Sequence, residues 1–229
     1  MRHAECLDLC VPLRERVMLE KLPDLVGHAL RGQSAGLEKT AFQAVDLRAG
    51  MAAITVGSLA FADHAPIPER YTADGEGVSP PLQWTGVPAA AASVLLIVED
   101  ADSPTPQPLV HAIVVDLPAG DGALQETALP SRGHDGAGLR LGRNSYLQAS
   151  WLPPDPPPGH GVHRYAFQVF ALEAGARLEG EPGREAVLEA IRERGLASGC
   201  LIGTYERPDT AISVGDEEGV PAILPPMPL

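Results

Sequence analysis

The chain has 229 residues, of which 45% are hydrophobic, and it carries a formal net charge of −13. No stretch approaches the run of about 20 apolar residues that a membrane-spanning helix requires, and no apolar signal-peptide core follows the first methionine. The acidic surface disfavours contact with a phosphate backbone. We therefore expect a cytoplasmic location, no membrane span and no nucleic-acid partner.

The first 52 residues predict a helical extension. Apolar residues recur at helical spacing in "PLRERVMLEKLPDLVGHALRG", where Pro23 is expected to start a second helix or kink a single one. Gly32 fits a helix C-cap. The apolar stripe needs a partner, either the arm's own domain or a second subunit, so a homodimer through this arm is one alternative. The natural start is either Met1 or Met18.

From about residue 53 the pattern becomes mainly β. Strands are expected at 54–61, 93–100, 109–116, 163–172 and 200–207, and a helix at 184–195. We therefore expect an N-terminal helical extension over 1–52, one β-rich domain over 53–207 and an irregular C-terminal tail over 208–229.

The chain lacks several motifs that mark common enzymes. It contains no G-x-S-x-G elbow, no H-E-x-x-H pair and neither of the glycine-rich phosphate-binding fingerprints. Its three cysteines, Cys6, Cys10 and Cys200, form no C-x-x-C pair and indicate reduced thiols. We expect no cofactor, no resident metal and no activated nucleophile, which makes a binding protein a better prediction than an enzyme.

Polar side chains interrupt two apolar strands. Asp100 and Asp102 follow the strand 93–100, and simple alternation places His111 on the same face as its apolar neighbours Leu109, Ile113 and Val115. A histidine in this setting is usually a hydrogen-bonded core residue. The alternative is a site at the end of the sheet, shared with other polar groups.

A second polar group stands at the start of the strand 163–172, after the proline-rich stretch "WLPPDPPPGHG". There His163 and Tyr165 share a face. If these side chains meet Asp100 and His111, a carboxylate would stabilise an imidazolium, and the histidines and the phenol would donate to a phosphate or carboxylate.

Three segments carry a resemblance to a known family. The stretches "IPERYTADGEGVSPPLQW", "DADSP…LVHA" and "WLPPDPPPGHGVHRYAF", with "QVFALE" after the last, resemble the ordered motifs of the phosphatidylethanolamine-binding protein family, and most closely its bacterial Raf-kinase-inhibitor-like branch. The likeness runs from about residue 54 to 206. It implies a β-sandwich with peripheral helices and a small anion-binding pocket at one end of a sheet.

The resemblance also implies a set of ligand-binding residues. Carried onto matching positions, it assigns to the pocket Asp100, Asp102, His111, His163 and Tyr165, with Trp84 and Pro104 as framework positions. The expected function is binding of a small anionic ligand that bears a phosphate or carboxylate, with a regulatory role such as kinase inhibition.

Two other functions stay open on sequence grounds. The Asp/His cluster could perform acid–base chemistry in a lyase, isomerase, cyclase or hydrolase. A metal site built from Asp100, His111, His160 and His163 is a further alternative, although histidines three apart on a strand or loop need not converge.

Overall fold

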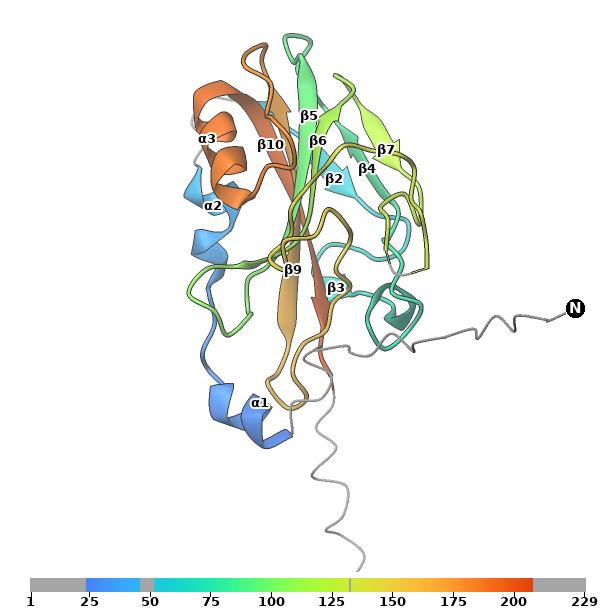
Figure 1. Cartoon of the computed structure of the whole chain (residues 1–229), viewed down its shortest axis with the longest axis vertical. Coiled ribbons are helices and arrows are strands. Elements are labelled where there is room, and N and C mark those ends of the chain that lie inside the picture. Colours follow the sequence, from blue (N-terminus) through green and yellow to red (C-terminus); the bar gives the residue numbers. More distant parts are fainter. Residues whose placement is uncertain (1–23, 46–51, 132, 208–229) are drawn as a thin grey trace, which may run out of the picture.

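The computed structural model describes residues 24–45, 52–131 and 133–207, and two β-sheets pack face to face in it (Figure 1). The elements are α1 (Asp24–Leu30), η2 (Leu37–Lys39), α2 (Ala41–Ala44), β1 (Ala52–Ala53), β2 (Thr55–Gly57), β3 (Ala65–Pro66), η3 (Glu69–Tyr71), β4 (Leu82–Thr85), β5 (Ser93–Asp100), β6 (Leu109–Leu117), β7 (Gly122–Leu124), β8 (Leu141–Gly142), β9 (His163–Leu172), α3 (Arg184–Arg194) and β10 (Gly195–Tyr205). The mainly-β class expected from the sequence is confirmed.

The larger sheet has the order β1-β10-β9-β5-β6-β8, with β3 also paired to β10, and the smaller sheet has the order β2-β4-β7. The long strands β10, β9, β5 and β6 are mutually antiparallel neighbours. β5 and β9 lie at the centre of the sheet and are buried on both faces, which explains their nearly continuous apolar sequences.

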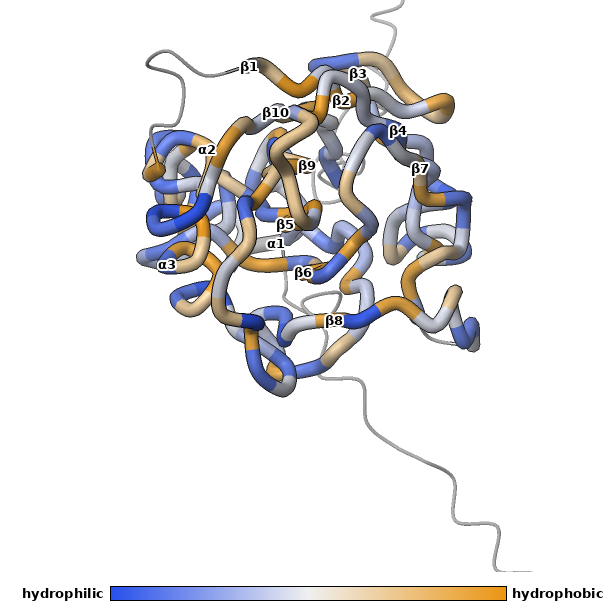
Figure 2. Tube along the Cα trace, turned by 90° about the horizontal axis from the view of Figure 1, so that it is seen from above, coloured by the Kyte–Doolittle hydropathy of each residue, from blue (hydrophilic) through white to orange (hydrophobic). Residues whose placement is uncertain are grey.

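Each face of the large sheet has its own hydrophobic core. The face toward the small sheet carries side chains such as Val98 and Phe167, which share a core with Trp84 of the small sheet. The opposite face packs against α2 and α3 through side chains such as Ile97 and Ile191 (Figures 1 and 2). The polar ends of the central strands lie beyond these cores, where loops rather than a second layer cover them.

The strongest sequence patterns predict their elements correctly. The predicted strands 93–100 and 163–172 coincide with β5 and β9, and the predicted helix 184–195 matches α3, which ends at Arg194 with Gly195 as its C-cap. The strand predicted at 54–61 is wrong in its second half, because the Ser58 hydroxyl donates to Pro81 O and the chain turns away after Gly57. β10 begins at Gly195, directly after the helix, instead of at residue 200.

The described part of the N-terminal arm packs on its own domain. α1 begins immediately after Pro23, and Gly32 takes the positive φ of 85° that favours glycine after a helix. The Arg31 guanidinium donates to Gly159 O at 2.7 and 3.0 Å, and Ala41 N donates to the buried Glu99 carboxylate at 2.7 Å. These contacts attach the arm to the loops and strand beside the candidate site.

Some predictions lie outside the described residues. They concern the helix before Pro23, the alternative starts, two of the three cysteines and the tail 208–229. In the described ranges, no helix is long and apolar enough to cross a membrane.

Candidate functional site

A β-bulge turns His111 toward the candidate site. Val98 of β5 pairs with Ala112 of β6, but the next residue, Glu99, pairs with Val110, so His111 is an extra residue in β6. Its ring lies against Tyr165 and Trp151, on the face toward the small sheet, with centroid distances of 5.1 and 6.1 Å. The prediction that His111 shares a face with Ile113 and Val115 is therefore wrong, because those two belong to the opposite core.

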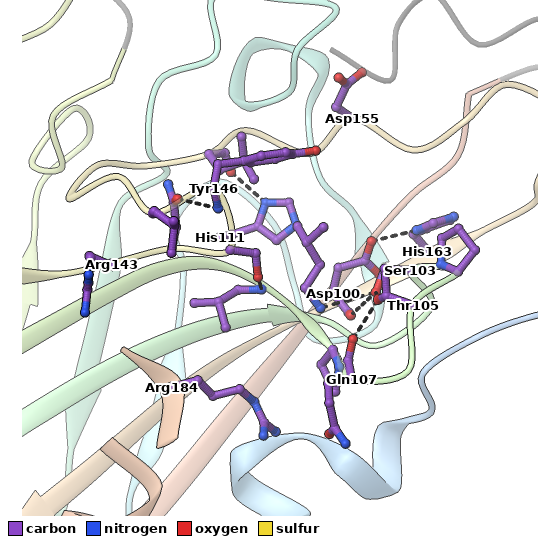
Figure 3. A pocket seen from close by; sticks show the side chains of 18 of the residues that line it. Asp100, Ser103, Thr105, Gln107, His111, Arg143, Tyr146, Asp155, His163 and Arg184 are labelled. Carbon is purple, nitrogen blue, oxygen red and sulfur yellow. Dashed lines mark hydrogen bonds and ion pairs between the residues drawn. The ribbon is translucent and has the colours of Figure 1, made fainter. Parts of the chain in front are cut away.

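Strand pairing brings the second polar group to the same place. β5 and β9 are antiparallel, and Asp100 lies opposite Tyr165. Because alternate residues share a face, His163 and Tyr165 both point toward the Asp100 carboxylate and the His111 ring. Residues more than 50 positions apart in the sequence thus form one cluster (Figure 3).

Asp100 ends a chain of short hydrogen bonds. Its Oδ2 lies 2.7 Å from Nδ1 of His163, and Nε2 of His163 lies 2.7 Å from Nδ1 of His160. Nε2 of His160 in turn lies 2.9 Å from Leu30 O, at the end of α1. The three bonds need three hydrogens, one more than two neutral imidazoles carry. The cluster is complete with an ionised Asp100 and one imidazolium, or with a protonated Asp100 and neutral rings.

His111 makes a different hydrogen bond. Its Nδ1 lies 2.6 Å from Leu152 O, and a carbonyl oxygen only accepts, so Nδ1 carries the hydrogen. Burial, the largest influence, lowers the pKa of His111 and favours the neutral ring, although the negative charge of Asp100 opposes this shift. Nε2 is then a lone pair, and within the described residues it is buried without a hydrogen-bond partner.

The Tyr165 hydroxyl is the second buried group that the described residues leave without a hydrogen-bond partner in this cluster. Burial, followed by the nearby Asp100, raises the pKa of Tyr165 well above its usual value, so the phenol keeps its proton. Its ring meets the His111 ring edge-on.

The remaining predicted residues have supporting positions. The Asp102 carboxylate accepts two side-chain bonds from Arg164, at 2.6 and 2.7 Å, and does not line the cavity described below. Trp84 lies in β4, where its indole donates to Gly120 O within the core between the sheets. Pro104 does line the cavity. The structure thus brings Asp100, His111, His163 and Tyr165 together and places Asp102 and Trp84 in the framework.

A cavity of about 1230 Å³ opens at this end of the sheet. Asp100, His111 and His163 line its polar end, together with the prolines of the loop 104–108. The lining continues around the edge of β6 to Arg184, whose guanidinium is paired with Glu99 at 2.6 Å on the helix-covered side. Figure 3 shows the predicted residues Asp100, His111 and His163 among the labelled residues that line this cavity.

Two wall residues were missed from the sequence, although both lie beside the cluster. Tyr146 is half-buried, and burial followed by the charge of Asp155 raises its pKa. Asp155 is the acidic residue inside the proline-rich stretch, and its carboxylate lies 2.6 Å from the Arg207 guanidinium. That isolated acid among prolines was the available signal. Tyr146 gave none, because a loop tyrosine has no periodic pattern.

The metal alternative receives no support from this geometry. His160 and His163 bond to each other, and Nδ1 of His111 is occupied by Leu152 O. Across residues 24–45, 52–131 and 133–207, no group of three or more His, Cys, Asp or Glu side chains is arranged to hold a metal ion.

Comparison with known proteins supports the resemblance in the sequence. The profile of the family described as phosphatidylethanolamine-binding protein matches residues 57–206. The chain belongs to this family. A UPF0098 protein of Methanothermobacter thermautotrophicus is 40% identical over 148 residues, which cover 65% of this chain and 95% of the relative. A putative lipoprotein, LppC, of Mycobacterium tuberculosis is 34% identical over 154 residues, which cover 67% of this chain and 72% of the relative.

Solved structures of phosphatidylethanolamine-binding protein homologues share the fold. A putative homologue from Chlamydia trachomatis has a TM-score of 0.60 and 34% identity, and the match covers 68% of this chain and 98% of that one. YbcL of Escherichia coli, described as a member of the mammalian family, has a TM-score of 0.60 and 26% identity, with 67% and 98% covered. Membership of the family indicates ligand binding. The cytoplasmic location stays a prediction, since one relative is named a lipoprotein.

Proposed function

We propose that this family member is a binding protein for small molecules that bear a phosphate or carboxylate group, held at the Asp100–His111–His163 end of the cavity. The observation that carries the proposal is the buried Nε2 of His111, which has no partner among the described residues and lies in the cavity wall. An unpaired buried polar atom costs about 1–3 kcal/mol, and a ligand that pairs it recovers part of that energy.

The affinity for a bare oxyanion should be low. A simple anion makes few contacts, so we expect dissociation constants on the order of millimolar, with tighter binding when the anion carries a group that fills the proline-lined wall. That wall, formed by the loop 104–108, is fixed to the arm through Ala35 N, which donates to Ser103 O at 3.0 Å.

The test is a titration with inorganic phosphate, O-phosphoethanolamine and acetate, followed by NMR of the histidine rings. We expect the His111 ring signals to shift with a saturable dependence and the His111→Gln variant to lose binding. The exposed His64 provides the matched control, His64→Gln, which should bind like the parent. No response of His111 to any of the three compounds would overturn the proposal.

One observation favours a second function, general acid–base catalysis. A neutral imidazole with a free lone pair next to a protonated phenol is an acid–base pair of the type used in isomerases and lyases. Turnover that is lost in His111→Gln and kept in His64→Gln would establish it. Regulation of a protein partner, kinase inhibition included, and a homodimer through the arm stay predictions that a pull-down and a sedimentation experiment would test.

A further inference from the structure

The histidines at the polar end of the cavity offer a ligand one hydrogen-bond acceptor and no donor. The two ring nitrogens of His163 are occupied by Asp100 and His160, so this ring has no donor left for a ligand. The Nδ1 hydrogen of His111 goes to Leu152 O, which leaves Nε2 as a lone pair. A bare oxyanion would place its own lone pairs against this nitrogen, a contact without a hydrogen between the two atoms.

None of the described groups around His111 supplies a hydrogen to its Nε2. Burial lowers the pKa of His111 most, the charge of Asp100 on β5 opposes this shift, and His163 on β9 adds to it, while Tyr165 keeps its proton. From the loops, Tyr146, Asp155 and Arg143 line the same cavity. The Asp155 carboxylate is paired with Arg207, and the Arg143 guanidinium donates to Glu181 O at 3.2 Å.

We propose that an oxyanion enters this site together with one proton, which becomes the hydrogen between Nε2 of His111 and the ligand oxygen. The inference rests on the proposed function and adds its proton balance. One N–H bond forms at Nε2, the proton comes from the solvent, and no bond of the ligand breaks. Release of the anion returns the proton and restores the neutral ring. The protein therefore binds an acid, as an imidazolium–oxyanion pair, and not an anion alone.

Acetate is the decisive probe because it stays ionised between about pH 6.5 and 8, so any proton taken up must reside on the protein. We expect its affinity to fall about tenfold per pH unit over this range, since one proton accompanies each ligand. Calorimetry in two buffers of different ionisation enthalpy should give an uptake of about one proton. Imidazole ¹⁵N spectra should show Nε2 of His111 gaining a hydrogen on binding.

The variants test the proton coupling separately from the proposed binding function. His111→Gln lacks the nitrogen that takes up the proton, so residual acetate binding must lose the tenfold change per pH unit, while His64→Gln must keep it. Acetate binding with no proton uptake, or with unchanged affinity across the pH range, overturns the proton coupling and leaves the binding function intact. Absence of acetate and phosphate binding at every pH overturns both.

Discussion

Replacing Asp100 with Asn tests whether the cluster depends on its hydrogen-bond pattern or on its charge. In the native protein Oδ1 accepts from Asp102 N at 2.8 Å and Oδ2 bonds to Nδ1 of His163. An asparagine oxygen can keep the first bond, and its amide can donate to Nδ1. His163 then carries its hydrogen on Nε2 and donates to Nδ1 of His160, while Nε2 of His160 keeps its hydrogen and donates to Leu30 O. All three bonds persist with every group neutral.

The expected magnitudes follow from this count. Hydrogen bonds to charged groups contribute about 1.5–3 kcal/mol and neutral ones about 0.5–1.5, so Asp100→Asn should lower the free energy of unfolding by about 1 kcal/mol. Asp100→Ala leaves Asp102 N and Nδ1 of His163 without an acceptor. Each buried group left without a partner costs about 1–3 kcal/mol, so Asp100→Ala should lower the free energy of unfolding by about 2–6 kcal/mol.

Urea unfolding followed by tryptophan fluorescence measures both variants, since Trp84 and Trp151 are buried. The exposed Asp135→Asn serves as a control that should unfold like the parent. Imidazole ¹⁵N spectra of Asp100→Asn should show a neutral His163 with its hydrogen on Nε2. If Asp100→Asn loses as much stability as Asp100→Ala, charge and not hydrogen-bond pattern holds the cluster, and the proton count is wrong.

Three other predictions concern stability. Glu99→Gln should lower the free energy of unfolding by about 3–5 kcal/mol, because Arg184 keeps a mostly buried charge without its carboxylate. The double variant Glu99→Gln/Arg184→Met removes that charge and keeps an amide oxygen for Ala41 N and Gln168 Nε2, so it should recover most of the loss in urea titrations. An equally large loss in both variants would contradict the ion-pair argument. Because the folded protein lowers the pKa of His111, protons bind the unfolded chain more readily, so the free energy of unfolding should fall as pH drops below about 6.5. His111→Gln should show a smaller fall between pH 7.5 and 5.5. Parallel plots of unfolding free energy against pH for the variant and the parent would refute this prediction. Leu147 has a φ of 60° and is 74% exposed, so Leu147→Gly should raise the unfolding free energy by up to about 1 kcal/mol, and a clear loss would show that the leucine side chain stabilises the fold.

The sequence by itself determined the class of the fold and most of its central strands. Continuous apolar runs such as 93–100 and 163–172 can satisfy both their backbone and their side chains only in the interior of a sheet. The ordered motifs between residues 67 and 167 named the family and pointed to Asp100, His111, His163 and Tyr165 before their positions in space were known. Short elements such as α2 are not predicted from the sequence, because four residues are too few to show a helical periodicity.

Only the tertiary structure decided the chemistry of the site. Alternation along β6 assigns His111 to the wrong face, because a bulge depends on how two strands pair and not on either sequence alone. The hydrogen on Nδ1 of His111 is set by the carbonyl of Leu152, 41 residues away, and both nitrogens of His163 are taken by neighbours that a strand pattern does not reveal. The sequence predicts an imidazolium that donates to an anion. The fold instead presents a buried lone pair, because burial and hydrogen-bond partners, which fix a histidine's protonation, arise only when distant segments meet.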